Sequence, residues 1–179
     1  PNFIQEVVHL CMEFMLELDD EDDWADASKA EAGSLVDVSN YDVGAENIDR
    51  LARALGPEKV LDHVFATVRA YVGHQESWKH RYAAIMTLSQ CAETLAEDAH
   101  VDQVVALLVS LLHDPHPRVR FAALHAIGQT SADHSPYLQE QHGELIMPAL
   151  SRLMDDPVVR VASHACAAFI NFAEEYEYE

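Results

Sequence analysis

The apolar positions of this 179-residue chain recur with the spacing of buried helix faces. Between residues 101 and 132, apolar residues at 104, 105, 107, 108, 111 and 112 predict one helix. A second helix is predicted from Pro117, because residues 119, 122, 123, 126, 127 and 130 follow the i, i+3, i+4, i+7 rule. Proline cannot donate a helical hydrogen bond, so the prolines in residues 113–117 separate the two helices. The stretch therefore predicts a helical hairpin.

The rest of the chain repeats this alternation of apolar helices and short breaks. Gly56-Pro57 and Pro136 to Gly143 are expected to be connectors, and Asp155 to Pro157 a turn. The other predicted helices span residues 3–18, 43–55, 58–72, 78–95, 144–154 and 158–175.

Three arginines mark a longer period in the sequence. Arg81-Tyr-Ala-Ala, Arg120-Phe-Ala-Ala and Arg160-Val-Ala-Ser lie 39 and 40 residues apart, each after a turn. A period near 40 with one helix pair per unit is typical of HEAT or armadillo solenoids. We therefore predict an all-α superhelix of about four helix pairs, with repeats at 1–56, 57–99, 100–142 and 143–179. The arginines are expected to pair with turn acids such as Asp114 and Asp155.

The chain starts directly in an apolar helical pattern and stops as a predicted helix ends, without polar capping repeats, so we expect a piece of a longer array. The composition is 49% hydrophobic, without an apolar run long enough to span a bilayer and without a signal-peptide pattern. Cys11, Cys91 and Cys166 fall on apolar helix faces without CxxC pairing. They are expected to be reduced core thiols of a cytosolic or nuclear protein.

The charge balance restricts the class of partner. The chain has 31 acidic and 11 basic residues, for a formal net charge of −20. This balance argues against direct nucleic-acid binding, which needs a basic surface, and favours cationic partners. Seven acids crowd into residues 17–26, and mutual repulsion predicts a solvated loop over about 19–40. A loop of this length is usually functional or disordered.

Four segments together resemble the beta-karyopherins, nuclear transport receptors of the importin-beta superfamily. They read EDDWADA, SWKHRYAAIMTLSQ, LLHDPHPRVRFAALHAIGQ and RVASHACAAFINFAEE. The specific feature is the combination of an acidic loop ending in Trp, a Trp-Lys-x-Arg turn and Asp-Pro-His-Pro-Arg-Val-Arg. The sequence is most similar to the importin-five branch, also called karyopherin beta-three. The resemblance covers nearly all of the chain, although residues 28–43 match poorly.

The resemblance implies a HEAT superhelix whose second helices line the concave wall. Such receptors bind basic nuclear localisation signals of cargo proteins on that wall and release them when the GTPase Ran binds in its GTP form. They shuttle between cytoplasm and nucleus, contact nucleoporins and use no cofactor. This segment resembles the middle of such a receptor, so most of the regions that bind Ran and nucleoporins are missing. No nucleic-acid binding or membrane insertion is expected.

One polar residue stands near the C-terminal end of each second helix. In the importin-five branch, matching positions accept lysine side chains of a signal peptide, which carboxylate and amide oxygens can bind. The alternative is that they are solvated or pair with the next repeat. Gln90 and Gln129 are candidates for bonding the peptide backbone, although a solvated polar face is the other interpretation. The four candidates for lysine binding are Asp49, Glu93, Asp133 and Asn171, the last three at +12, +13 and +11 from the registered arginines.

The acidic loop is a second candidate site, for a basic surface of cargo or of Ran. Trp24 beside Glu21, Asp22 and Asp23 can hold the stem and charged head of Lys or Arg. The alternative is a charge run with the indole packed on the scaffold. Trp78 is expected to pack rather than to bind.

Catalysis and metal binding find little support in the sequence. The residues His113-Asp114 and His116 fall in a proline turn, and neither HExxH nor a repeated His-Glu dipeptide occurs. No phosphate-binding loop or nucleophile elbow is present. We therefore predict a binding protein and not an enzyme. The alternatives are a HEAT scaffold subunit, for example of a phosphatase, and, more remotely, a HEAT-type metalloenzyme.

Overall fold

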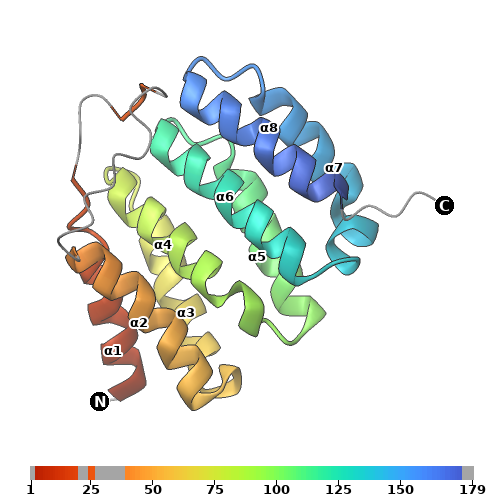
Figure 1. Ribbon diagram of the computed structural model, residues 1–179. Helices are drawn as coiled ribbons and strands as arrows, with labels where there is room; N and C mark the ends of the chain where they lie inside the picture. The colour runs from red at the N-terminus through yellow and green to blue at the C-terminus, as the bar shows by residue number, and fades with distance from the viewer. Residues whose placement is uncertain (1–2, 20–23, 27–38, 175–179) are drawn as a thin grey trace. The chain divides into compact units, whose positions relative to one another are not determined.

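Helix is the only regular structure in the described part of the chain, which comprises residues 3–19, 24–26 and 39–174 of a computed structural model. Eight α-helices and one 3-10 turn occur there, so the predicted all-α class is confirmed (Figure 1). The chain divides into two compact units, residues 1–94 and residues 95–179. Among the described residues, no helix is long and apolar enough to cross a membrane.

The first unit pairs its helices in two layers. Helices α1 and α2 pack on each other, as do α3 and α4, while α1 contacts α3 and α2 contacts α4. Val8, Met12, Ile48, Val64 and Leu88 fill the space between the layers. The bounds are α1 Phe3–Phe14, α2 Asn40–Leu55, α3 Pro57–Val72 and α4 Trp78–Cys91, which the 3-10 turn Ala92–Thr94 follows.

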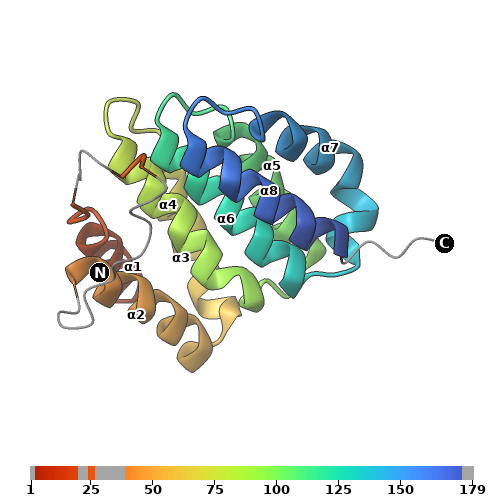
Figure 2. The same cartoon turned by 45° about the horizontal axis from the view of Figure 1, so that its top comes forward.

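The second unit has the same plan. Helices α6 and α8 lie side by side along their length and form one layer, with α5 and α7 in the other (Figures 1 and 2). Ala122, Ala123 and Ala126 are buried on α6, and these small side chains allow close helix packing. Leu108 and Phe172 are fully buried. The bounds are α5 Asp98–Leu111, α6 Pro117–Asp133, α7 Tyr137–Leu153 and α8 Val159–Glu174.

Local sequence signals explain where several helices begin. The Ser39 hydroxyl accepts a hydrogen bond from the Asp42 amide, and the Asp42 carboxylate accepts one from the Ser39 amide at 3.1 Å. This reciprocal capping box satisfies two amides at the start of α2. Pro57 and Pro117 occupy the first position of their helices, where no amide hydrogen is needed.

The predicted helix bounds depart furthest from the observed ones in three places. Helix α1 ends at Phe14 instead of Leu18, and α4 gives way to a 3-10 turn after Cys91. The expected connector at 136–143 is largely helical, since α7 begins at Tyr137. The prediction treated Gly143 as a break, but Leu138 and Ile146 on either side of it are fully buried and extend the apolar face of α7. Their burial outweighs the cost of about 1 kcal/mol for one helical glycine.

Two of the registered arginines, Arg81 and Arg120, bond to turns, and Arg120 pairs with the turn acid next to the expected one. Arg120 forms a two-pronged ion pair with Asp156, next to the predicted Asp155, at 2.7 and 2.9 Å. Arg120 reaches Asp114 through that residue's carbonyl oxygen, at 2.9 Å. The Asp156 carboxylate also accepts the Val158 amide at 2.9 Å, so this acid organises the turn before α8. Arg81 likewise donates to turn carbonyls.

Candidate functional site

In the first unit, the candidate acids Asp49 and Glu93 share one internal cation. Asp49 is half-buried on α2, and Glu93 is exposed on the 3-10 turn that follows α4. The Arg53 Nε donates to Asp49 at 2.8 Å, and the Arg53 Nη2 donates to Glu93 at 2.7 Å. The hydrogen bond to Asp49, and then the charges of both acids, raise the pKa of Arg53. Gln90 is half-buried on α4, three residues before Glu93.

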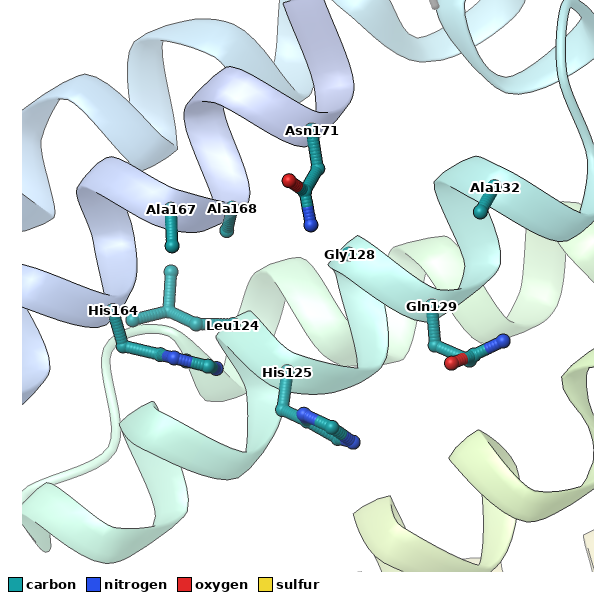
Figure 3. A pocket seen from close by; sticks show the side chains of 9 residues that line it. All are labelled: Leu124, His125, Gly128, Gln129, Ala132, His164, Ala167, Ala168 and Asn171. Atoms are coloured by element: carbon teal, nitrogen blue, oxygen red, sulfur yellow. The ribbon is translucent and has the colours of Figure 1, made fainter. Parts of the chain in front are cut away.

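In the second unit, a groove of about 190 Å³ runs between α6 and α8. Both Gln129 of α6 and Asn171 of α8 line this groove; the Asn171 side chain points toward α6, whereas the Gln129 side chain points away from α8 (Figure 3). The Gln129 Nε2 donates to Asp133 at 3.0 Å, which places a carboxylate beside the Gln129 amide. The lining residues are Leu124, His125, Gly128, Gln129, Ala132, His164, Ala167, Ala168 and Asn171.

Stacked rings form another part of the groove wall. His164 lies face to face with Phe121 at 4.1 Å between ring centroids, and His125 stacks on His164 at 5.9 Å. The Arg160 guanidinium lies 5.5 Å from the centroid of the Phe121 ring. Burial, followed by the charges of His125 and Arg160, lowers the pKa of His164 to about 4. His164 is therefore neutral at neutral pH, and its buried Nε2 has no hydrogen-bond partner among the described residues.

The groove combines surfaces that suit an extended peptide. Small residues at Gly128, Ala132 and Ala167 leave room for a side chain between the helices. The amides of Gln129 and Asn171 can each donate and accept hydrogen bonds, as a peptide backbone requires. The carboxylate of Asp133 can accept a bond from an ammonium group. The groove therefore offers neutral polar groups along its length and a negative charge at the Asp133 end.

The four residues predicted to bind lysine have different surroundings in the two units. None of Asp49, Glu93, Asp133 and Asn171 is buried, so all four are accessible in their own units. In the first unit the two acids are bridged by Arg53, whereas in the second unit Asn171 and Gln129 line one groove and Asp133 bonds to Gln129. The assignment of these residues to cargo binding stays a prediction.

The acidic loop is described only in part. Trp24 is half-buried, while Glu21, Asp22 and Asp23 lie outside the described residues. At the start of the loop, Lys79 donates to the carbonyl oxygen of Leu18 at 2.6 Å and thereby ties the end of α1 to α4. Trp78 is half-buried and packs edge-to-face on Tyr82, as a packing residue would.

The cysteine prediction needs one correction. Cys11 and Cys91 are buried as expected, and burial raises the pKa of Cys91 to about 12. Cys166 is exposed, because the buried face of α8 is set by Val161, Ala165, Ala168 and Phe172. Within the part of the chain that the structure describes, no group of three His, Cys, Asp or Glu side chains could hold a metal ion.

Arg53, His125 and His164 were missed by reasoning from the sequence. A signal for Arg53 was available, since it follows Asp49 by one helical turn and precedes Glu93 by 40 residues, one repeat period. The histidines gave no such signal, because their stacking depends on how α6 and α8 pack.

Comparison with known proteins finds importin and HEAT repeats along the chain. The importin repeat matches residues 1–62, and the HEAT repeat family matches residues 74–171. Importin subunit beta-3 of Saccharomyces cerevisiae is 33% identical over 177 residues, which are 97% of this chain and 16% of that protein. The chain therefore spans about one sixth of the length of this relative.

Solved structures of the karyopherin Kap121p have the same fold over this segment. One is bound to the extreme C-terminus of the protein phosphatase Cdc14p and another to RanGTP. Each matches with a TM-score of 0.85 and 31% identity, over 98% of this chain and 18% of the karyopherin.

Proposed function

Because the chain belongs to the HEAT-repeat family and is a homologue of the importin beta-3, or Kap121p, type of karyopherin, we propose that it is the cargo-binding segment of a nuclear import receptor. It binds basic, lysine-containing localisation signals without any catalytic step. The longer receptor releases cargo when Ran-GTP binds, contacts nucleoporins, and shuttles between cytoplasm and nucleus. The Kap121p structures with Cdc14p and with RanGTP support this role.

The observation that carries the proposal is the groove between α6 and α8. Gln129 and Asn171 line this groove and are proposed to bond a peptide backbone, and Asp133, which accepts a hydrogen bond from Gln129, is proposed to bind a lysine ammonium. A single exposed ion pair contributes only about 0.5 to 1 kcal/mol, so affinity must come from several such contacts in different repeats. The formal net charge of −20 adds attraction for a basic ligand. The acids Glu21, Asp22 and Asp23, with Trp24, are proposed to contact basic surfaces of cargo or of Ran.

The test is titration of the 179-residue chain with a fluorescent peptide that carries three spaced lysines, read by anisotropy. Glu93→Ala combined with Asp133→Ala is expected to weaken binding about tenfold, since each lost charge contact is worth up to about 1 kcal/mol. The matched control replaces Asp62 and Glu144, exposed acids on the first helices α3 and α7, and makes the same change in net charge.

Binding that falls only in the Glu93 and Asp133 variant supports the proposal. Equal losses in both variants would mean that the peptide senses only the net charge. Unchanged binding in both variants would favour a HEAT scaffold that uses another surface.

A further inference from the structure

The contact made by Arg53 differs from an ordinary surface ion pair in what it joins. It bridges two candidate lysine-binding acids of neighbouring second helices, at 2.8 Å to Asp49 and 2.7 Å to Glu93. The Arg53 side chain is 58% exposed and that of Glu93 is 65% exposed, so the contact lies at the surface, where an incoming ligand can reach it. The guanidinium already donates to one oxygen of each carboxylate, Asp49 Oδ1 and Glu93 Oε2, and its charge opposes the approach of a lysine ammonium.

Arg53 occupies the same position in its repeat as Glu93 and Asp133 do in theirs. Arg53, Glu93, Asp133 and Asn171 follow one another at steps of 40, 40 and 38 residues. Arg53 is thus the cation in a series whose other members are acids or an amide. In the second unit the corresponding acid, Asp133, accepts its hydrogen bond from the neutral amide of Gln129. In the first unit, one positive charge offsets one of the two acids.

We infer that Arg53 is a built-in competitor of cargo lysine, an autoinhibitory contact that occupies Asp49 and Glu93 until a ligand displaces it. The inference rests on the proposed function, because it needs these acids to accept a lysine. Displacement is feasible, because exposed ion pairs are weak and both long side chains can swing into solvent. The contact therefore lowers affinity in the first unit and favours ligands that bring a lysine close enough to replace the guanidinium.

The test uses Arg53→Gln, which removes the cation and keeps a polar side chain of similar reach. The lysine peptide is expected to bind about 3- to 10-fold more tightly to this variant than to the wild-type chain. The control is Arg50→Gln on the same helix, where Arg50 is 69% exposed and lies 3.9 Å from Glu46. It changes the net charge equally and is expected to alter affinity less than twofold. A gain for Arg53→Gln that Arg50→Gln does not reproduce supports the inference.

A second variant shows where the gain arises. Adding Glu93→Gln to Arg53→Gln is expected to return the affinity to the wild-type value or below it. Thermal unfolding by circular dichroism checks that both Arg53 variants keep the fold, as expected for an exposed side chain. If Arg53→Gln binds no more tightly than Arg50→Gln, the inference is overturned. In that case the proposed function still stands if the lysine peptide binds more weakly to the variant with Glu93→Ala and Asp133→Ala than to the wild-type chain.

The position of the guanidinium provides a direct readout. In the free chain the Arg53 Nε–H is held by Asp49, so its NMR signal should differ from that of a solvated arginine. Saturating lysine peptide is expected to move this signal to the solvated position, whereas a peptide with glutamine in place of lysine should not. A signal unchanged by bound lysine peptide would also overturn the inference. Loss of all peptide binding in every chain, wild type included, would instead overturn the proposed function itself.

Discussion

His164 shows how one side chain can couple the groove to pH. Its ring is held between Phe121 and His125, with a buried Nε2 that has no hydrogen-bond partner among the described residues. A proton on this ring would be poorly solvated and would face the charge of Arg160, which is why the pKa of His164 falls to about 4. Folding therefore favours the neutral form of the His164 imidazole.

The chain is expected to lose stability in mild acid because of His164. The unfolded state binds a proton as the pH falls through about 6.5, but the folded state does so only near pH 4. The free energy of unfolding therefore falls between these values, by about 2 kcal/mol from pH 7 to pH 5. His164→Phe keeps a ring on Phe121 and should lose correspondingly less over this interval, as urea unfolding at the two pH values measures. The exposed His9→Gln serves as the control, and equal losses in His164→Phe and wild type would contradict the assignment.

The partners of individual side chains are what the sequence did not predict. The types of residue in the candidate site were predictable, because the registered arginines locate positions near helix ends to within one residue. The partners were not, since Arg120 bonds to Asp156 and not to the adjacent Asp155. Both acids lie in the turn between α7 and α8, and a repeat period read from the sequence does not fix which side chain of a turn faces the arginine.

At the scale of elements, the closeness of α1 and α2 depends on a single glycine. A Cβ at Gly44 would lie 2.4 Å from the carbonyl oxygen of Cys11 and 2.9 Å from the Met15 Cγ. The first of these atoms is backbone and cannot move without shifting α1. Glycine at this position of α2 is therefore a packing requirement, although it costs helix propensity.

Gly44→Ala is expected to destabilise the chain by about 1 to 3 kcal/mol, because overpacking must separate α1 from α2. The matched control is Gly128→Ala on α6, where the nearest atom to a new Cβ is Asn171 Nδ2 at 3.9 Å. That change meets no clash and should stabilise by up to about 1 kcal/mol through helix propensity. The midpoints of urea unfolding compare the two. Stabilisation by both alanines would show that α1 and α2 are not in close contact in solution.

The helices themselves were largely predictable because their signals are local. Proline at the first position and apolar spacing located α3 and α6 to within a residue, with a glycine before the proline at α3. The start of α7 was misplaced because no local signal separates a glycine that ends a helix from one buried within it. That distinction comes from Leu138 and Ile146, whose burial depends on the rest of the unit.

At the scale of the whole molecule, the formal charge of −20 is the property whose effect depends most on the salt concentration. It was read directly from the composition, as was the period of about 40 that predicted the confirmed HEAT fold. The contacts within each unit, such as that of Arg53 with Asp49 and Glu93, could not be read from either, because they depend on how the side chains pack.

Affinity for a lysine peptide is expected to fall about tenfold when KCl is raised from about 50 to about 300 mM. Exposed charges are screened over about 8 Å at physiological ionic strength and over shorter distances above it. Anisotropy titrations at the two salt concentrations measure the change, with a glutamine-substituted peptide as the control. A lysine peptide whose affinity ignores salt would argue against an electrostatic binding surface.

The position of Cys166 has a practical consequence. Of the three thiols in the chain, Cys11 and Cys91 are enclosed by the first unit, and only Cys166 faces solvent. A maleimide dye should therefore attach to the natural sequence at one known place, on α8, without any cysteine having to be removed. A fluorophore there would share its helix with Asn171 and could report ligand arrival as a change in emission.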